Sequence, residues 1–359
     1  MVHERQTRRS FLHGHAASRE LVGRIQRIDV PAAMANRRTL IASVRRRAMA
    51  CEFEVQLAAA RDDNAMEHVF AALDLVEALE AQLSVYRDDS EVSRINQTAQ
   101  QFAVPVEPQL FQLIEQARQL HADTGGALDI TSGPLSEIWG FSRREGRVPS
   151  DDQVAAALQR VGMQHVELDA ARRTIMFRQP GMSINFNSLG KGYALDRMAT
   201  LVAEHGVDDI LLQGGKSSVL ARGNQPGGSG TGWLVGVRHP LRNDVPLAQI
   251  VLHDQALSTS GAGTQFFIRR GQRYGHILDP RTGRPAEGLY SATVLAPTAT
   301  QAEGLSTAFY VMGPQKAAEY CAARPEIAAL LVAPGERAGD VRLNALGQDS
   351  SRWLRLADD

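Results

Sequence analysis

The sequence predicts an α+β protein with antiparallel sheets. Up to about residue 161 amphipathic helical patterns dominate the chain, whereas beyond Gly181 short apolar runs follow one another closely. Strands in short succession, with helices gathered before and between them, indicate antiparallel sheets rather than a doubly wound parallel sheet. With 359 residues, the chain is long enough for one large domain or two intimate halves around a sizeable core.

Each expected element rests on a local pattern. Residues 51–57 alternate apolar and polar side chains, which predicts a half-buried strand, and residues 64–83 repeat apolar side chains at helical spacing. Further helices are expected around residues 110–120, which end at a glycine stop in 123–126, and over residues 151–161. Later helices are expected at 191–205 and 301–312, and strands at 209–213, 233–237, 248–252, 265–268, 275–278 and 292–295.

Charge is distributed unevenly along the chain. Residues 1–47 hold eleven arginines and three acidic residues, a net charge of +8, while the whole chain carries −1 and the remainder therefore −9. We expect a basic N-terminal arm over residues 1–45, a single domain over residues 46–340 and a C-terminal tail over residues 341–359. A basic arm can contact nucleic acid or a membrane, but it is more often a solvated tail, so no nucleic-acid partner is expected.

The N-terminal region matches export signals only in part. Thr7–Leu12 imitates the opening of a twin-arginine signal, and Ala48–Cys51 hints at a lipoprotein cleavage site. Export requires an apolar stretch, which charged residues interrupt in the first case and Arg45–Arg47 replace in the second. We therefore expect a cytoplasmic protein, with a periplasmic or membrane-associated location as the alternative. No stretch approaches a membrane span.

The motifs exclude several kinds of site. Cys51 and Cys321 are the only cysteines and lie far apart, so neither a disulfide framework nor a zinc cluster is expected. The G-x-S-x-G nucleophile elbow of hydrolases is absent. The spacings also match neither a Walker P-loop nor a G-x-G-x-x-G dinucleotide fingerprint.

A glycine and lysine motif lies in I-N-F-N-S-L-G-K-G-Y-A-L-D, residues Ile184–Asp196. Gly190 and Gly192 let the backbone approach a ligand closely, and the helix that begins here offers free N–H groups to an anion. Lys191 adds a positive charge suited to a phosphate. The alternative is an ordinary helix start with a solvent-exposed lysine.

A pair of oxygen ligands is expected in A-E-G-L-S-T-A, residues Ala302–Ala308. Glu303 and Thr307 are four residues apart, so they share one face of a helix. Carboxylate and hydroxyl oxygens suit Mg²⁺, which is usually held by few protein ligands together with substrate phosphates. Alternatively, Glu303 is an acid favoured near a helix N-terminus and Thr307 faces inward.

A histidine and an aspartate flank a tight turn in H-I-L-D-P-R-T-G-R-P, residues His276–Pro285. Alternation of side chains places His276 on one face of a strand, and Asp279 followed by Pro280 is typical of a type I turn. A structural turn explains Asp279 but not His276, for which the alternative is a locally satisfied, half-buried imidazole. Together the three motifs indicate a nucleotide-handling magnesium site.

In this order the three motifs resemble the ApbE family, the FAD:protein FMN transferases. The resemblance runs from about Arg46 to about Gly313 and includes L-S-V-Y-R-D-D-S-E-V-S-R-I-N (Leu83–Asn96) and G-A-L-D-I-T-S-G-P-L (Gly126–Leu135). It implies the family's fold, two intimate α+β halves with antiparallel sheets and a flavin nucleotide bound between them.

The resemblance also implies which residues contact FAD. Tyr86 has a flat face for the flavin ring and a hydroxyl group, and Met49 is an adaptable partner for an aromatic ring. For Met49 and Leu128 the alternative is a core position, and for Asp129 it is a capping role. The implied FAD contacts are Met49, Tyr86, Ala127, Leu128, Asp129, Asn185, Lys191 and Ile277.

The implied reaction joins the FMN part of FAD to a Ser or Thr hydroxyl of an acceptor flavoprotein through a phosphoester bond and releases AMP. FAD is then a substrate and Mg²⁺ the cofactor. Ser188, Glu303 and Thr307 would bind the magnesium ion. His276 would lie beside the reacting phosphate, and His276 and Asp279 are the candidates for activating the hydroxyl or orienting the site.

The chain departs from the family pattern at three positions. The family usually has Asp where this chain has Asn185, Gly where it has Asn187, and Asp where it has Glu303. Two other functions therefore stay open at this point: a protein that binds FAD without transferring FMN, and a pyrophosphatase that converts FAD to FMN and AMP.

Overall fold

The computed structural model describes residues 41–58, 63–228, 230–242, 245–261, 263, 265–337, 339–347 and 353–355. Its centre is an eight-stranded sheet in the order β1-β2-β6-β7-β10-β15-β16-β17, in which every neighbouring pair is antiparallel. The strands are β1 (Ile41–Ala48), β2 (Cys51–Ala58), β6 (Ile210–Gly214), β7 (Ser218–Arg222), β10 (Gln255–Gly261), β15 (Ser291–Ala296), β16 (Ala328–Pro334) and β17 (Val341–Leu346).

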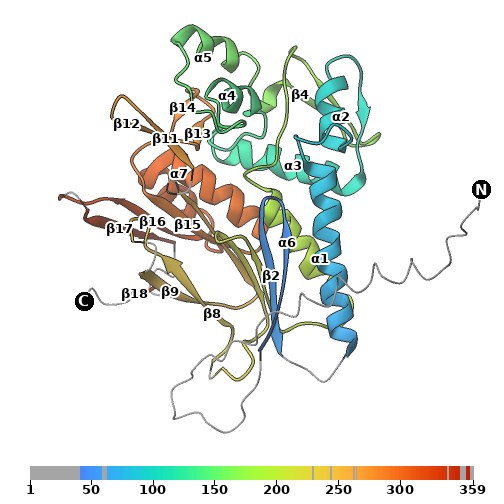
Figure 1. The fold of residues 1–359 in the computed structure, drawn as a ribbon, viewed down its shortest axis with the longest axis vertical. Coiled ribbons are helices and arrows are strands. Elements are labelled where there is room, and N and C mark those ends of the chain that lie inside the picture. The colour runs from blue at the N-terminus through green and yellow to red at the C-terminus, as the bar shows by residue number, and fades with distance from the viewer. Residues whose placement is uncertain are drawn as a thin grey trace, which may run out of the picture.

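Three long helices pack together against the sheet: α1 (Asp63–Leu83), α6 (Gly190–Ala203) and α7 (Ala299–Ala322), as Figure 1 shows. Their apolar faces and the facing strands bury one continuous core, in which Phe53, Leu73 and Phe309 are among the largest fully buried side chains. Burial of such side chains stabilises the fold by about 1.5–3 kcal/mol each. No described helix is long and apolar enough to cross a membrane.

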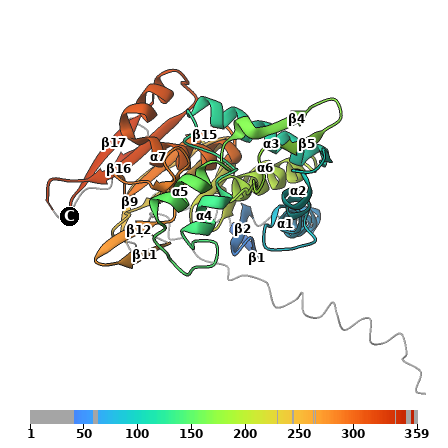
Figure 2. The ribbon, with the colours of Figure 1, turned by 90° about the horizontal axis from the view of Figure 1, so that it is seen from above.

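Smaller elements surround this centre. Helices α2 to α5, which form a helical region, and the sheet β3-β5-β4 lie at one end of the molecule (Figure 1). The sheet β18-β9-β8 covers a second apolar cluster around Trp233. Two hairpins, β11–β12 and β13–β14, lie beside α4 and α5 (Figures 1 and 2). The helices are α2 (Glu91–Thr98), α3 (Pro108–Asp123), α4 (Gly133–Ile138) and α5 (Asp151–Leu158). The strands are β3 (Val104–Pro105), β4 (Val166–Asp169), β5 (Thr174–Phe177), β8 (Trp233–Arg238), β9 (Pro246–Leu252), β11 (Phe266–Arg269), β12 (Gln272–Gly275), β13 (Leu278–Asp279), β14 (Arg284–Pro285) and β18 (Leu354–Arg355).

Helices α6 and α7 approach each other closely at their N-termini. A Cβ atom added to Gly192 would lie 2.2 Å from the backbone oxygen of Ala299, so only glycine fits there. The carboxylate of Asp196 accepts hydrogen bonds from the backbone N–H groups of Ala299 and Thr300, at 2.8 Å each, and from the Thr300 hydroxyl at 2.6 Å. A side chain of α6 therefore caps α7, and this fixes the two helix starts relative to each other.

The structure confirms the α+β class with antiparallel sheets and corrects some boundaries. Strand β1 begins at Ile41, inside the stretch expected as an arm, and residues 1–40 lie outside the described part of the chain. Strand β17 lies in the expected tail, yet it pairs with β16 and extends the central sheet. The single strand expected over 275–278 is wrong, because β12 ends at Gly275, β13 begins at Leu278, and the two pair with different strands.

Candidate functional site

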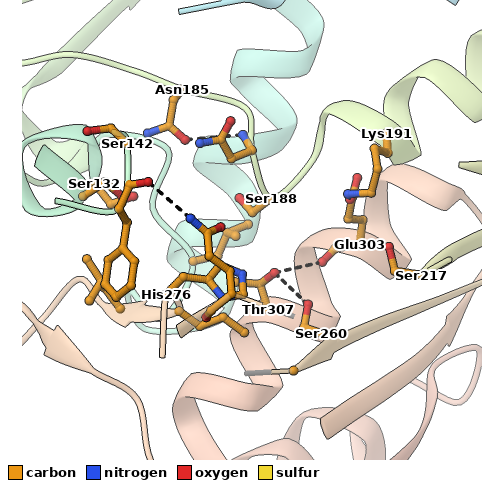
Figure 3. Close-up of a pocket in the computed structure, with 18 of the residues that line it drawn as sticks. Ser132, Ser142, Asn185, Ser188, Lys191, Ser217, Ser260, His276, Glu303 and Thr307 are labelled. Atoms are coloured by element: carbon orange, nitrogen blue, oxygen red, sulfur yellow. Dashed lines mark hydrogen bonds and ion pairs between the residues drawn. The ribbon is translucent and has the colours of Figure 1, made fainter. Parts of the chain in front are cut away.

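A cleft of about 790 Å³ opens between the helical region, the start of α6, the turn between β6 and β7, and strand β10. This volume lies within the range of small-molecule and cofactor sites. All residues that the sequence predicts for the site line the cleft except Met49 and Asp279. Figure 3 shows how side chains from separate parts of the chain converge there, among them His276, Lys191 and Glu303. The three sequence motifs therefore meet at one place.

Lys191 and Glu303 form an ion pair across the starts of α6 and α7. The second carboxylate oxygen of Glu303 accepts a hydrogen bond of 2.6 Å from the backbone N–H of Gly192. Burial would lower the pKa of Lys191, but the charge and hydrogen bond of Glu303 outweigh it, so the pKa is raised and the ammonium stays charged. The alternative of a solvent-exposed lysine is wrong for Lys191.

The carboxylate of Glu303 takes the position that the sequence assigns to an anionic ligand. The side chain is only 5% exposed and reaches the N-terminal turn of α6, where free N–H groups and the helix dipole favour a negative charge. The negative charge of Glu303 therefore interacts favourably with the dipole of α6 rather than with the dipole of its own helix, α7.

The three residues predicted to bind a metal all line the cleft. Thr307 shares a face of α7 with Glu303, as their spacing predicts, and its hydroxyl lies 3.1 Å from that of Ser260 (Figure 3). Ser188 lines the same cleft. Among the described residues no three His, Cys, Asp or Glu side chains group closely enough to hold a metal ion. One carboxylate with several hydroxyls fits Mg²⁺ when substrate phosphates supply the remaining ligands.

His276 lies between β12 and β13 with its ring fixed by a backbone carbonyl. Its Nδ1 atom is 3.0 Å from the oxygen of Gln265, and because a carbonyl only accepts, Nδ1 carries the proton. Burial lowers the pKa of His276, and the nearby charge of Lys191 lowers it further, so the imidazole is neutral. Its Nε2 atom then presents a lone pair, which is what a general base requires.

The structure places Asp279 in a turn rather than in the cleft. Its carboxylate accepts hydrogen bonds from the backbone N–H and the guanidinium of Arg281, at 2.8 to 2.9 Å. The turn also closes through a 2.8 Å bond from the backbone N–H of Gly283 to the backbone oxygen of Asp279. The indole of Trp139 donates to the Gly283 carbonyl at 2.8 Å. Asp279 therefore stabilises the β13–β14 hairpin beside His276. These contacts agree with the alternative that Asp279 is a structural turn residue.

Met49 also lies outside the cleft lining. With Ala50 it forms the two-residue turn of the β1–β2 hairpin, at φ values of 49° and 57°. These positive values are those of a type I′ turn, which suits the twist of antiparallel strands but favours Gly or Asn over Met and Ala. The Met49 side chain packs against the main core. The predicted flavin contact of Met49 stays a prediction.

Asp129 lines the cleft and at the same time organises the loop that carries it. Its Oδ1 atom accepts bonds from the backbone N–H of Thr131 at 2.8 Å and from its hydroxyl at 2.6 Å. Its Oδ2 atom lies 3.2 Å from His121, whose pKa is raised by this carboxylate. The capping alternative for Asp129 is therefore supported by its contacts. Asn185 is tied to the same loop, because its backbone N–H donates to Ile130 at 2.8 Å.

Sequence reasoning missed a second set of polar residues in the cleft. Lys216 and Ser217 follow β6, Arg238 ends β8, and Ser258 and Ser260 lie on β10. With Lys191, the side chains of Lys216 and Arg238 bring positive charges to the cleft, and these suit a polyphosphate. The glycine pair Gly214 and Gly215 at the end of β6 is a local feature that could have pointed to Lys216 and Ser217 as cleft residues. Nothing local marks the others, because strand pairing brings them together from distant parts of the chain.

Fold and site together define an α+β protein with a cleft for a phosphate-bearing nucleotide. The sequence matches the model of the ApbE family over residues 49–331. This match covers most of the chain, and the protein belongs to the ApbE family. The resemblance seen in the motifs is thereby confirmed.

Two bacterial relatives share one name. The chain is 34% identical over 243 residues to the FAD:protein FMN transferase of Salmonella typhimurium, covering 66% of this chain and 69% of that protein. It is 32% identical over 286 residues to the FAD:protein FMN transferase of Treponema pallidum, covering 76% of this chain and 78% of that protein.

Solved structures agree with this assignment. The crystal structure of the ApbE protein from Thermotoga maritima superposes with a TM-score of 0.78 at 28% identity, covering 88% of this chain and 100% of that chain. The apo form of the Pseudomonas stutzeri flavinyl transferase ApbE gives 0.74 at 30% identity, covering 87% and 95%. The fold predicted from the motifs is therefore that of solved ApbE proteins.

Proposed function

We propose that this protein is an FAD:protein FMN transferase, which moves the FMN part of FAD to a Ser or Thr hydroxyl of an acceptor protein and releases AMP. Family membership and the names of the relatives support this function. The observation that carries it is the cleft itself, which combines a neutral His276 with the cation of Lys191. A base beside a phosphate-binding cation is the arrangement that transfer to a hydroxyl requires.

In the proposed reaction the acceptor hydroxyl attacks the phosphorus on the FMN side of the pyrophosphate. A new bond forms between the hydroxyl oxygen and this phosphorus, and the bond from the phosphorus to the bridging oxygen breaks. His276 accepts the hydroxyl proton at Nε2, and AMP leaves with the bridging oxygen. Lys191 binds the pyrophosphate and balances its charge, for which it turns from Glu303 towards the substrate.

Mg²⁺ belongs to this proposal as the cofactor. Glu303, Thr307 and Ser188 would hold it, since they supply oxygen ligands from two sides of the cleft. When bound, the ion neutralises charge on the pyrophosphate and stabilises the leaving AMP. Glu303 needs a free oxygen for this role, which it gains when Lys191 turns to the substrate.

The proposal is tested by incubating the purified protein with FAD and Mg²⁺, with and without a protein that carries an acceptor hydroxyl. Release of AMP only when the acceptor is present supports transfer. Release at the same rate without an acceptor means that the protein is a pyrophosphatase. Binding of FAD with no AMP release under either condition means that it retains FAD without chemistry.

A further inference from the structure

A second hollow adjoins the cleft. This groove has a volume of about 210 Å³ and shares Pro240, Gly263 and Tyr290 with the cleft, so the two hollows lie side by side. Its walls are mainly apolar, with proline and tyrosine side chains next to Leu241, which is 41% exposed. At this size it falls below the usual range for a small-molecule site, although it suits one or two side chains of an extended peptide.

The outer face of the β11–β12 hairpin continues the groove. Phe266 and Ile268 point outward from β11, with exposures of 44% and 66%. Across the hairpin Ile268 pairs with Arg273, whose guanidinium lies 4.0 Å from the centre of the Phe266 ring. Arg273 also lines the groove, as does Gly275, the residue before His276. An exposed apolar face and the groove therefore lead to the proposed base.

The inner face of the same hairpin is anchored. Phe267 stacks on Tyr274 with ring centres 5.1 Å apart, and both pack against a small core cluster that contains Trp139 and Phe141. The two faces alternate along β11, as expected for a strand. The exposed side chains therefore lie on a fixed support, and apolar side chains held in this way are typical of an interaction surface.

We propose that the groove and the outer face of β11–β12 dock the acceptor polypeptide next to its Ser or Thr. This inference rests on the proposed function. The cleft holds FAD, and only the acceptor hydroxyl has to reach His276, so the chain on at least one side of that hydroxyl must leave the cleft. The groove offers an exit that begins at Gly275, the residue before His276. Its lining selects an extended segment with apolar side chains beside the hydroxyl.

Synthetic peptides provide the test. A set of peptides with one central threonine and varied apolar neighbours is incubated with FAD and Mg²⁺, and the peptide that gains FMN fastest becomes the probe. Leu241→Asp places a charge in the groove, and Ile268→Asp places one on the outer face of β11. Leu234→Asp is the matched control, because Leu234 on β8 is 50% exposed and lines neither hollow.

The expected result is a rise of about tenfold or more in KM for the peptide in Leu241→Asp and Ile268→Asp, which corresponds to losing about 1.4 kcal/mol of docking energy. Their dissociation constants for FAD should equal those of the parent and of Leu234→Asp, which also shows that the variants are folded. If the KM for the peptide is unchanged in both Leu241→Asp and Ile268→Asp, the docking site is wrong but the proposed transfer of FMN is not. Absence of transfer to every peptide and protein acceptor overturns the proposed function and the docking site together.

Discussion

Glu303 and Lys191 are joined by an ion pair that links the starts of α7 and α6 at the floor of the cleft. The pair holds the only glutamate or aspartate of α7 that reaches the cleft and a lysine that the family motif assigns to the nucleotide. Besides forming this ion pair, Lys191 would bind the pyrophosphate and Glu303 the metal ion in the proposed reaction. Binding of the substrate pyrophosphate and Mg²⁺ would separate the pair.

Removing the lysine should weaken FAD binding. Lys191→Met keeps the length and apolar stem of the side chain but loses the ammonium, whose charged hydrogen bond contributes about 1.5–3 kcal/mol. We expect the dissociation constant for FAD to rise by about tenfold or more. Titration of flavin fluorescence measures it. Lys316→Met is the control, because Lys316 does not line the cleft. If both variants bind FAD with equal affinity, Lys191 does not contact FAD.

Substitutions of Glu303 separate a metal ligand from a purely structural acid. Glu303→Gln can still accept the hydrogen bond of Gly192 but loses the negative charge, so AMP release should become far less responsive to Mg²⁺. Glu303→Asp keeps the negative charge and introduces the residue that the family usually has at this position. This variant should keep its activity. The measurement is AMP release against Mg²⁺ concentration for the parent and both variants. A parent-like magnesium dependence in Glu303→Gln would show that Glu303 does not hold the metal.

The pH profile should report His276 in its neutral form. Burial, together with the charge of Lys191, places its pKa below the ordinary 6.5. A protonated imidazole cannot accept the hydroxyl proton, so transfer should stay constant as pH falls to about 6.5 and decline only at lower pH. His276→Gln should slow transfer by about 10²–10⁴-fold and abolish this decline. A profile in His276→Gln with the same acidic limb as the parent would assign that limb to another group.

The close approach of α6 and α7 should be sensitive to a single methyl group. Gly192→Ala places a Cβ atom 2.2 Å from the Ala299 oxygen, so the two helices must separate. We expect a loss of about 1–3 kcal/mol in the free energy of unfolding and weaker FAD binding, because Lys191 and Glu303 no longer meet. Gly236→Ala is the control, since a Cβ atom at Gly236 meets nothing within 4 Å. Denaturant unfolding of both variants is the measurement, and equal stability would show that the helix starts can adjust.

The sequence predicted those parts of the site that depend on local spacing. A spacing of four positions puts Glu303 and Thr307 on one helix face, and the turn chemistry after Asp279 forms the hairpin that the structure shows. Local spacing could not reveal the partner of Lys191, because Glu303 lies 112 residues further along the chain. Nor could it bring Arg238 into the cleft.

The same limit applies to the fold. Helices with strong periodicity, such as α1 and α3, were predicted almost to their ends because their buried faces repeat along the chain. Strand β17 was taken for a tail, since only its pairing with β16 marks it as part of the sheet. The break at His276 was missed as well, because alternation of side chains continues where the chain changes its pairing partner from β11 to β14.

Transfer of FMN from FAD to a protein hydroxyl can be followed through the two phosphorus atoms of FAD. FAD labelled with radioactive phosphorus either on the FMN side or on the AMP side is incubated with the protein, Mg²⁺ and an acceptor. We expect the acceptor to gain label only from the FMN-side preparation, with one AMP released for each acceptor modified. Label that appears in free FMN while the acceptor stays unlabelled would contradict this transfer.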